Sequence, residues 1–147
     1  MPSYQVFINR DRIKESQKAL IAAAITDTHV QMTGAPDYYV QVIFNCLDRM
    51  DHYVGGREGA EILWIRGDVR PRDAQSNKNL MLALVEAVGN VCDIAKDDIW
   101  VDLTPVEPDN IVKFRTVLPL PGDEKIWFDA LPEEIRHRLR SEEKQQE

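Results

Sequence analysis

Cysteine is scarce in this chain, and long apolar runs are absent. Its two cysteines, Cys46 and Cys92, stand in no CxxC pair and beside no histidine, so we expect small buried apolar residues in a reducing compartment. No apolar run approaches the roughly 20 residues of a membrane helix. The opening residues, MPSYQVFINRDR, also lack the apolar core of a cleavable signal peptide. These absences predict a cytoplasmic protein.

A basic surface is also missing, because 25 acidic residues outnumber 18 basic ones and give a net charge of -7. This balance argues against a general binder of nucleic acid or of anionic membranes. The three histidines are scattered and no carboxylates cluster, so we expect no metal site. No glycine-rich loop has the pattern of a phosphate motif, and we expect no cofactor. A small anionic substrate stays possible, because an arginine cluster can outweigh the net charge at contact distance.

What is present is an alternation of strand and helix patterns, which predicts one domain over residues 1–147. The expected elements are strands at 4–9, 38–46, 61–67 and 98–103, a helix from Ser16 to a cap at Gly34, and a second helix at 77–94. The turn-rich stretch between the two halves carries Gly55 and Gly56 at its centre and is expected to be a loop or hairpin.

The sequence is similar to itself when it is shifted by 60 residues, as the difference between positions 18 and 78 shows. The shift aligns KALIAAAI (18–25) with KNLMLALV (78–85), and YVQVI (39–43) with IWVDL (99–103). We interpret this as a β-α-β duplication with units at about 2–46 and 61–104. It predicts an α/β (α+β) fold: a four-stranded mixed sheet with right-handed crossovers and two helices on one face. The other face then needs a cover, which predicts an oligomer.

The C-terminal part, about 105–147, contains five of the eight prolines. Its pattern predicts a short helix around 108–115, an extended arm through Pro119 and Pro121, and a final helix from about 132. We expect that this arm forms no core alone and docks across a neighbouring subunit.

Pro2 is the first candidate for chemistry. A small second residue allows removal of Met1, which would turn the prolyl nitrogen into a free secondary amine. An α-amino group has a pKa of about 8, and burial beside cations would lower that pKa further. Such an amine can act near neutral pH as a general base or a general acid. A Met-Pro start alone is weak evidence, but here it opens directly into a strand that would hold the nitrogen rigidly.

Two arginines and a histidine could bind a substrate. Arg70 and Arg72 follow a strand at a spacing of two, so they can converge on one carboxylate, and Arg66 could contribute instead. The plainer alternative is a solvated loop with surface ion pairs. His29 lies near the end of the first helix, where the helix dipole would favour its cation, and it could donate a hydrogen bond to a substrate oxygen. The plainer reading of His29 is a cap or a surface residue.

Together these segments resemble the tautomerase superfamily, and within it the group around cis-3-chloroacrylic acid dehalogenase. The resemblance extends from Pro2 to about residue 130 through ITDTHVQMTG, the glycine pair, IWV and LPLPGDEKIWFD. It implies a cofactor-free homotrimeric enzyme acting on a small carboxylate, with Pro2 as the catalytic proline and His29 as the substrate-binding histidine. It also implies that Arg70 is the first carboxylate-binding arginine. The family's second arginine falls three residues later, where this chain has Asp73, so Arg72 is the candidate to replace it.

Two positions depart from the family pattern. The group has a tyrosine after the IWV motif and a water-activating glutamate eleven residues later, where this chain has Asp102 and Lys113. A lysine there would add positive charge to the anion site, so Asp102 and Lys113 are substrate-binding candidates, and the missing glutamate argues against dehalogenation. The leading hypothesis is keto-enol tautomerisation. The alternatives are a malonate-semialdehyde-type decarboxylase or hydratase, indicated by Asp37 and the arginine spacing, and a catalytically inactive trimeric scaffold.

Overall fold

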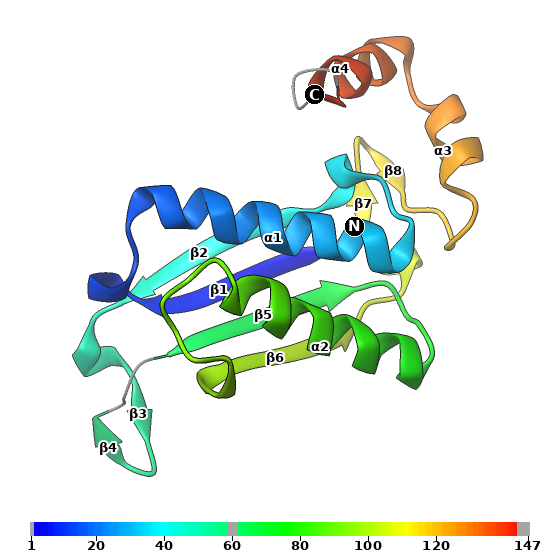
Figure 1. The fold of residues 1–147 in the computed structure, drawn as a ribbon. Helices are drawn as coiled ribbons and strands as arrows, with labels where there is room; N and C mark the ends of the chain where they lie inside the picture. The colour runs from blue at the N-terminus through cyan, green and yellow to red at the C-terminus, as the bar shows by residue number, and fades with distance from the viewer. Residues whose placement is uncertain (1, 59–61, 144–147) are drawn as a thin grey trace.

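The computed structural model describes residues 2–58 and 62–143, with side chains up to residue 141. Its four-stranded sheet has the order β2-β1-β5-β6. The strands are β1 (Ser3–Asn9), β2 (Gln41–Leu47), β5 (Leu63–Val69) and β6 (Ile99–Pro105). β1 pairs parallel with β2 and antiparallel with β5, and β5 pairs parallel with β6. Helices α1 (Glu15–Thr33) and α2 (Ala74–Gly89) join the parallel pairs and cover one face of the sheet (Figure 1). The predicted mixed sheet of duplicated β-α-β units is confirmed.

The main core lies between the two helices and the sheet. Alternate residues of β1 point toward the helices, and Tyr4, Val6 and Ile8 are at most 1% exposed. The helices meet them with buried apolar residues at helical spacing, namely Ile21 and Ile25 of α1 and Leu80, Leu84 and Val88 of α2. The intervening residues of β1 lie on the opposite, open face of the sheet.

Two predicted boundaries shift for identifiable reasons. The predicted strand at 38–46 begins only at Gln41, because residues Asp37–Tyr39 form a 3-10 helix in which the Asp37 carboxylate accepts the Tyr38 N–H at 2.6 Å. The predicted helix at 77–94 is shifted toward the N-terminus, to Ala74–Gly89. It starts early because the Asp73 side chain caps it, accepting the Ser76 backbone N–H at 2.9 Å.

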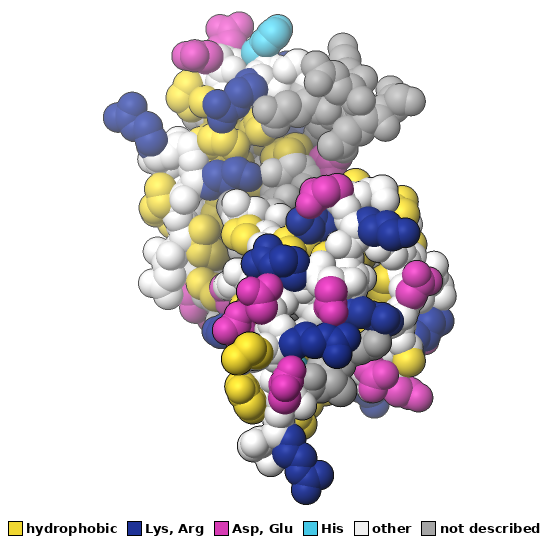
Figure 2. Space-filling view, turned by 90° about the vertical axis from the view of Figure 1, so that its left-hand side faces the viewer, with side chains coloured by type: hydrophobic (Ala, Val, Ile, Leu, Met, Phe, Trp, Pro, Cys, Tyr) yellow, Lys and Arg dark blue, Asp and Glu magenta, His cyan; other side chains and the backbone are white. Residues whose placement is uncertain are grey.

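The turn-rich stretch was expected to be a loop or a hairpin. It forms a hairpin of β3 (Tyr53–Val54) and β4 (Arg57–Glu58). Gly55 and Gly56 form its turn with φ of 59° and 74°, the left-handed conformation that favours glycine. Seen from the side that carries this hairpin, basic and acidic side chains are interspersed on the described surface, without a large field of one sign (Figure 2). None of the described helices is long and apolar enough to span a membrane.

Both cysteines are unpaired, and each is half-buried at the margin of the main core rather than fully buried.

The short helix expected around 108–115 is wrong. A single 3-10 turn at Pro108–Asn110 is followed by a second hairpin, β7 (Val112–Lys113) and β8 (Thr116–Val117). Phe114 and Arg115 form its turn with φ of 54° and 64°, an unfavourable backbone for residues with side chains. A two-residue hairpin turn needs positive φ at both of its residues, and here the Phe114 ring also packs on Trp127, with ring centroids 6.2 Å apart.

The C-terminal arm packs against Tyr39 of its own chain, and its docking across a neighbouring subunit stays a prediction. Helices α3 (Glu124–Ala130) and α4 (Glu133–Glu143) follow the second hairpin and lie beyond one end of the sheet (Figure 1). They enclose a second apolar cluster with the 3-10 helix that precedes β2. The buried members of this C-terminal cluster are Tyr39, Leu118, Trp127, Leu131 and Leu139.

Candidate active site

Pro2 lies buried where the two central strands meet. Its carbonyl accepts the Gln41 backbone N–H at 3.0 Å, which ties it to the start of β2. Its neighbour Ser3 is opposite Asp68 near the end of β5. The antiparallel register therefore brings Pro2 beside the segment that leaves β5, and this segment carries Arg70 and Arg72.

His29 faces the sheet, so it is neither a cap nor a surface residue. It is only 1% exposed, on the same face of α1 as Ile21 and Ile25. Its Nδ1 lies 2.7 Å from the hydroxyl oxygen of Tyr4, and the two rings meet edge to face. Burial lowers the pKa of His29 to about 3, and the positive charges of Arg72 and Arg70 act in the same direction. The expectation that the helix end favours the cation is wrong here, because desolvation and the arginines outweigh the dipole.

Arg70 is an anchored residue. Its side chain is 5% exposed, and Nη2 pairs with Oε1 of Glu124 at 2.6 Å while Nη1 donates to the Pro119 carbonyl at 3.1 Å. The second carboxylate oxygen of Glu124 accepts the Gly122 N–H at 2.8 Å. Burial alone would raise the pKa of Glu124, but the hydrogen bond from Arg70 and the backbone donors outweigh burial and lower that pKa. Arg70 thus ties the C-terminal arm to the end of the sheet.

Arg72 is placed differently from Arg70. It is half-buried, and its Nη1 donates to the Arg70 carbonyl at a long 3.4 Å. Burial lowers its pKa, and the charge of Arg70 lowers it further. Among the described residues, no carboxylate forms an ion pair with it. Arg72 also acts electrostatically on both Tyr4 and His29, so its charge lies close to that pair. The structure therefore brings Pro2, His29, Arg70 and Arg72 to one end of the sheet.

Asp102 and Arg66 lie on the open face of the sheet, away from the helices. The indole Nε1 of Trp64 donates to the Asp102 carboxylate, and Asp102 is opposite Arg66 in the register of β5 and β6. Their neighbours Ile65 and Val101 point toward the core. Within one subunit, Asp102 and Arg66 are thus on the other face from Tyr4 and His29.

Lys113 belongs to the margin of the C-terminal cluster. Its ammonium donates to the Tyr38 carbonyl at 2.8 Å and lies 5.1 Å from the centre of the Phe114 ring. The Asp37 carboxylate nearby is bound to a backbone N–H and is half-buried. Of the six candidate residues, Asp102 therefore lies on the open face of the sheet. Lys113 lies at the margin of the C-terminal cluster, 5.6 Å from the centre of the Tyr39 ring, and the charge of Arg70 also acts on Tyr39.

A family model described as "Putative oxalocrotonate tautomerase enzyme" matches residues 1–112. The chain belongs to this tautomerase family. The chain is also similar to N1, a member of the cis-3-chloroacrylic acid dehalogenase family with a known crystal structure, and the two sequences are 33% identical. That match covers 95% of this chain and 99% of the other, with a TM-score of 0.90. The predicted resemblance to the cis-3-chloroacrylic acid dehalogenase-like group is thereby confirmed.

More distant structures share the fold of this chain. Native Ps01740 is 23% identical with a TM-score of 0.71, and the match covers 76% of this chain and 99% of that one. The Q0 fused 4-OT, described as a symmetric trimer, is 24% identical with a TM-score of 0.67, covering 74% and 89%. A search of curated proteins gave no significant match.

Two residues of this group were missed from the sequence. Tyr4 lies two residues after Pro2 on the inward face of β1, and a buried tyrosine needs a hydrogen-bond partner, so the alternation of β1 could have indicated it. Glu124 pairs with a residue 54 positions earlier, and no local pattern connects the two.

Proposed function

We propose that this tautomerase-family protein interconverts the keto and enol forms of a small carboxylate, with the amine of Pro2 as the group that moves the proton. Removal of Met1 is required, because only then is the nitrogen basic. The amine would accept a proton at one substrate atom and return it at another, so the reaction needs no second substrate. The observation that carries the proposal is the buried Pro2 beside two arginines and a neutral His29.

In this proposal, Arg72 binds the substrate carboxylate. Arg70 supports Arg72 through its backbone carbonyl, which accepts the hydrogen bond from Arg72 Nη1. Arg72 has a half-buried guanidinium without an ion pair to a described carboxylate, which supports a role in binding an external anion. His29 would donate a hydrogen bond to the substrate oxygen on which negative charge develops. A neutral imidazole can do this, because its one N–H is a donor.

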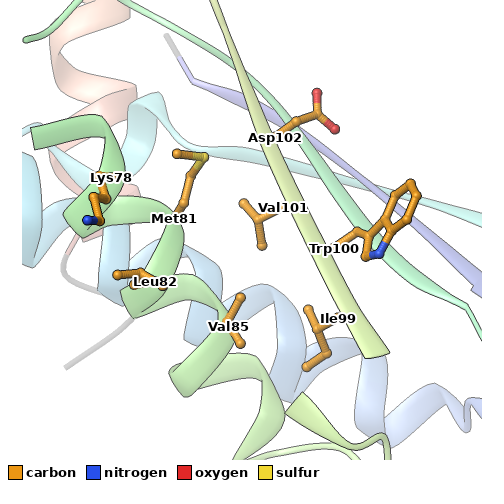
Figure 3. A pocket seen from close by; sticks show the side chains of 8 residues that line it. All are labelled: Lys78, Met81, Leu82, Val85, Ile99, Trp100, Val101 and Asp102. Carbon is orange, nitrogen blue, oxygen red and sulfur yellow. The ribbon is translucent and has the colours of Figure 1, made fainter. Parts of the chain in front are cut away.

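We propose that the protein assembles as a homotrimer. An apolar groove between α2 and the edge strand β6 supports this, and Trp100 beside it is 70% exposed (Figure 3). The groove is lined by Lys78, Met81, Leu82, Val85, Ile99, Trp100, Val101 and Asp102. Asp102, on the open face of the sheet, would then approach a substrate only from a neighbouring subunit. Analytical ultracentrifugation gives the assembly mass directly.

The decisive experiment compares Pro2→Ala with Ser3→Ala. Ser3 is the adjacent residue and its hydroxyl contacts only the Gln41 side chain among the described residues, so S3A controls for disturbance of the strand end. Intact mass spectrometry first establishes that Met1 has been removed. With the enol of phenylpyruvate as substrate, P2A should lose about 100-fold or more in kcat/KM, and S3A should retain activity.

The other outcomes are informative as well. An unchanged rate in P2A contradicts the role of the amine. Release of carbon dioxide from malonate semialdehyde, together with no enol turnover, would assign the decarboxylase alternative. A retained Met1 and no turnover across enols, acetylenic acids and 3-oxo acids would favour the scaffold alternative.

A further inference from the structure

The Tyr4 ring lies in a space that the neighbouring strand leaves open. The side chain is fully buried, and it lies opposite Gly67 in the pairing of β1 and β5. A Cβ atom at Gly67 would lie 2.6 Å from Cε1 of the Tyr4 ring, so only glycine leaves room for the ring there. The ring extends from β1 toward α1, where its hydroxyl meets His29. The strand register, the glycine and the helix together fix where this hydroxyl lies.

The hydrogen bond between Tyr4 and His29 can be oriented in two ways. Either the Tyr4 O–H donates to Nδ1, or an Nδ1–H donates to the phenol oxygen. In the second orientation the phenol proton has no acceptor among the described residues, and a buried donor without a partner is costly. The first orientation satisfies both groups, and the 2.7 Å separation is typical of an O–H donor.

The protonation states agree with the first orientation. Burial raises the pKa of Tyr4, although Arg72 opposes this, so the phenol keeps its proton. The lowered pKa of His29 leaves the imidazole neutral, with one nitrogen free to accept. A neutral histidine that accepts at Nδ1 must carry its proton on Nε2.

We propose that Tyr4 is a positioning residue that fixes His29 in the Nε2–H tautomer and holds its ring in place, so that Nε2 is the donor to the substrate oxygen. The catalytic part of this inference rests on the proposed function, whereas the tautomer assignment does not. Tyr4 itself touches no reacting atom. Its effect reaches the reaction through the orientation of the imidazole, as with partners that fix histidine ligands.

The test compares Tyr4→Phe with Tyr39→Phe. Tyr39 is equally buried, but its hydroxyl has no hydrogen-bond partner among the described residues and it belongs to the C-terminal cluster. Y39F therefore removes a buried phenol oxygen without touching His29. Nitrogen-15 NMR of histidine-labelled protein reports the tautomer, and His29→Gln identifies the signal of His29 among the three histidines.

The expected spectrum has a protonated Nε2 and an unprotonated, hydrogen-bonded Nδ1 in the wild type and in Y39F. In Y4F the hydrogen-bond shift of Nδ1 should disappear, and kcat for the enol of phenylpyruvate should fall about 10- to 100-fold while KM changes less than about threefold. A wild-type signal from Nδ1–H overturns the tautomer assignment. A Y4F enzyme with unchanged kcat overturns the positioning role. A wild type without turnover overturns the proposed function and the positioning role together, and the tautomer assignment is then decided by the spectrum alone.

Discussion

Replacing Glu124 with alanine should release the C-terminal arm from the end of the sheet. The change leaves the Arg70 guanidinium 5% exposed with only the Pro119 carbonyl as a described acceptor. Removing one partner of a fully buried ion pair costs about 3–5 kcal/mol. Glu124 is 21% exposed, so water can partly replace it, and we expect a loss of about 2–3 kcal/mol in the free energy that holds the arm.

The assay is hydrogen exchange followed by mass spectrometry, segment by segment. Exchange should accelerate across α3 and α4, whereas β1 should keep its protection because the main core contains no residue of the arm. The matched control is Lys125→Ala, which breaks an ion pair with Asp129 on the surface of the same helix. Since the Lys125 side chain is 88% exposed, we expect no measurable change in the control. Equal protection in E124A and K125A would refute the reasoning.

Two further predictions concern Arg72 and His29. Arg72→Lys should raise KM for a carboxylate substrate about 10-fold with little change in kcat, because a lysine lacks the bidentate fork of arginine. The thermal unfolding temperature should stay as in the wild type. An unchanged KM would assign the carboxylate to another residue. His29 has a folded pKa of about 3, below its ordinary 6.5, so the unfolded chain binds a proton that the folded chain does not. Its contribution to stability is therefore full above pH 6.5 and is lost as pH falls toward 3, with a slope of up to about 1.4 kcal/mol per pH unit. Urea unfolding across this range measures the slope, which His29→Gln should reduce.

The fold was predictable because its determinants are periodic. Alternation along the strands and the shift of 60 residues between KALIAAAI and KNLMLALV fixed the order of elements, and the parallel pairs follow from two helical crossovers. The early start of α2 comes from its local Asp73 cap, whereas the two other misplaced segments contain side chains with distant partners. Tyr39 lies in the 3-10 helix before β2, and its ring packs on Trp127, 88 positions later by residue number. Phe114, expected in a helix, lies in a hairpin turn with its ring on the same Trp127.

The proximity of four candidate residues was predictable from the sequence, but their surroundings were not. Pro2, His29, Arg70 and Arg72 do lie at one end of the sheet, as their places on the elements indicated. The charge state of His29 was not predictable, because it depends on burial and on two arginines that follow another strand. Spacing alone also made Arg70 and Arg72 equivalent, although the backbone turns one toward the arm and leaves the other beside His29.

The different surroundings of the two arginines can be separated by a double-mutant cycle. Arg70→Ala and Glu124→Ala should each destabilise the arm by leaving the other charge buried, whereas the double variant removes both charges and should be less destabilised than the sum of the two. We expect a coupling energy of about 1–3 kcal/mol, measured by exchange of α3. Arg72→Ala combined with Glu124→Ala should show a weaker coupling, because these side chains form no ion pair and Glu124 acts on Arg72 only through its charge. A coupling in the Arg70 cycle no larger than that in the Arg72 cycle would mean that Arg70 does not anchor the arm, and it would leave Arg70 as available for a substrate carboxylate as Arg72.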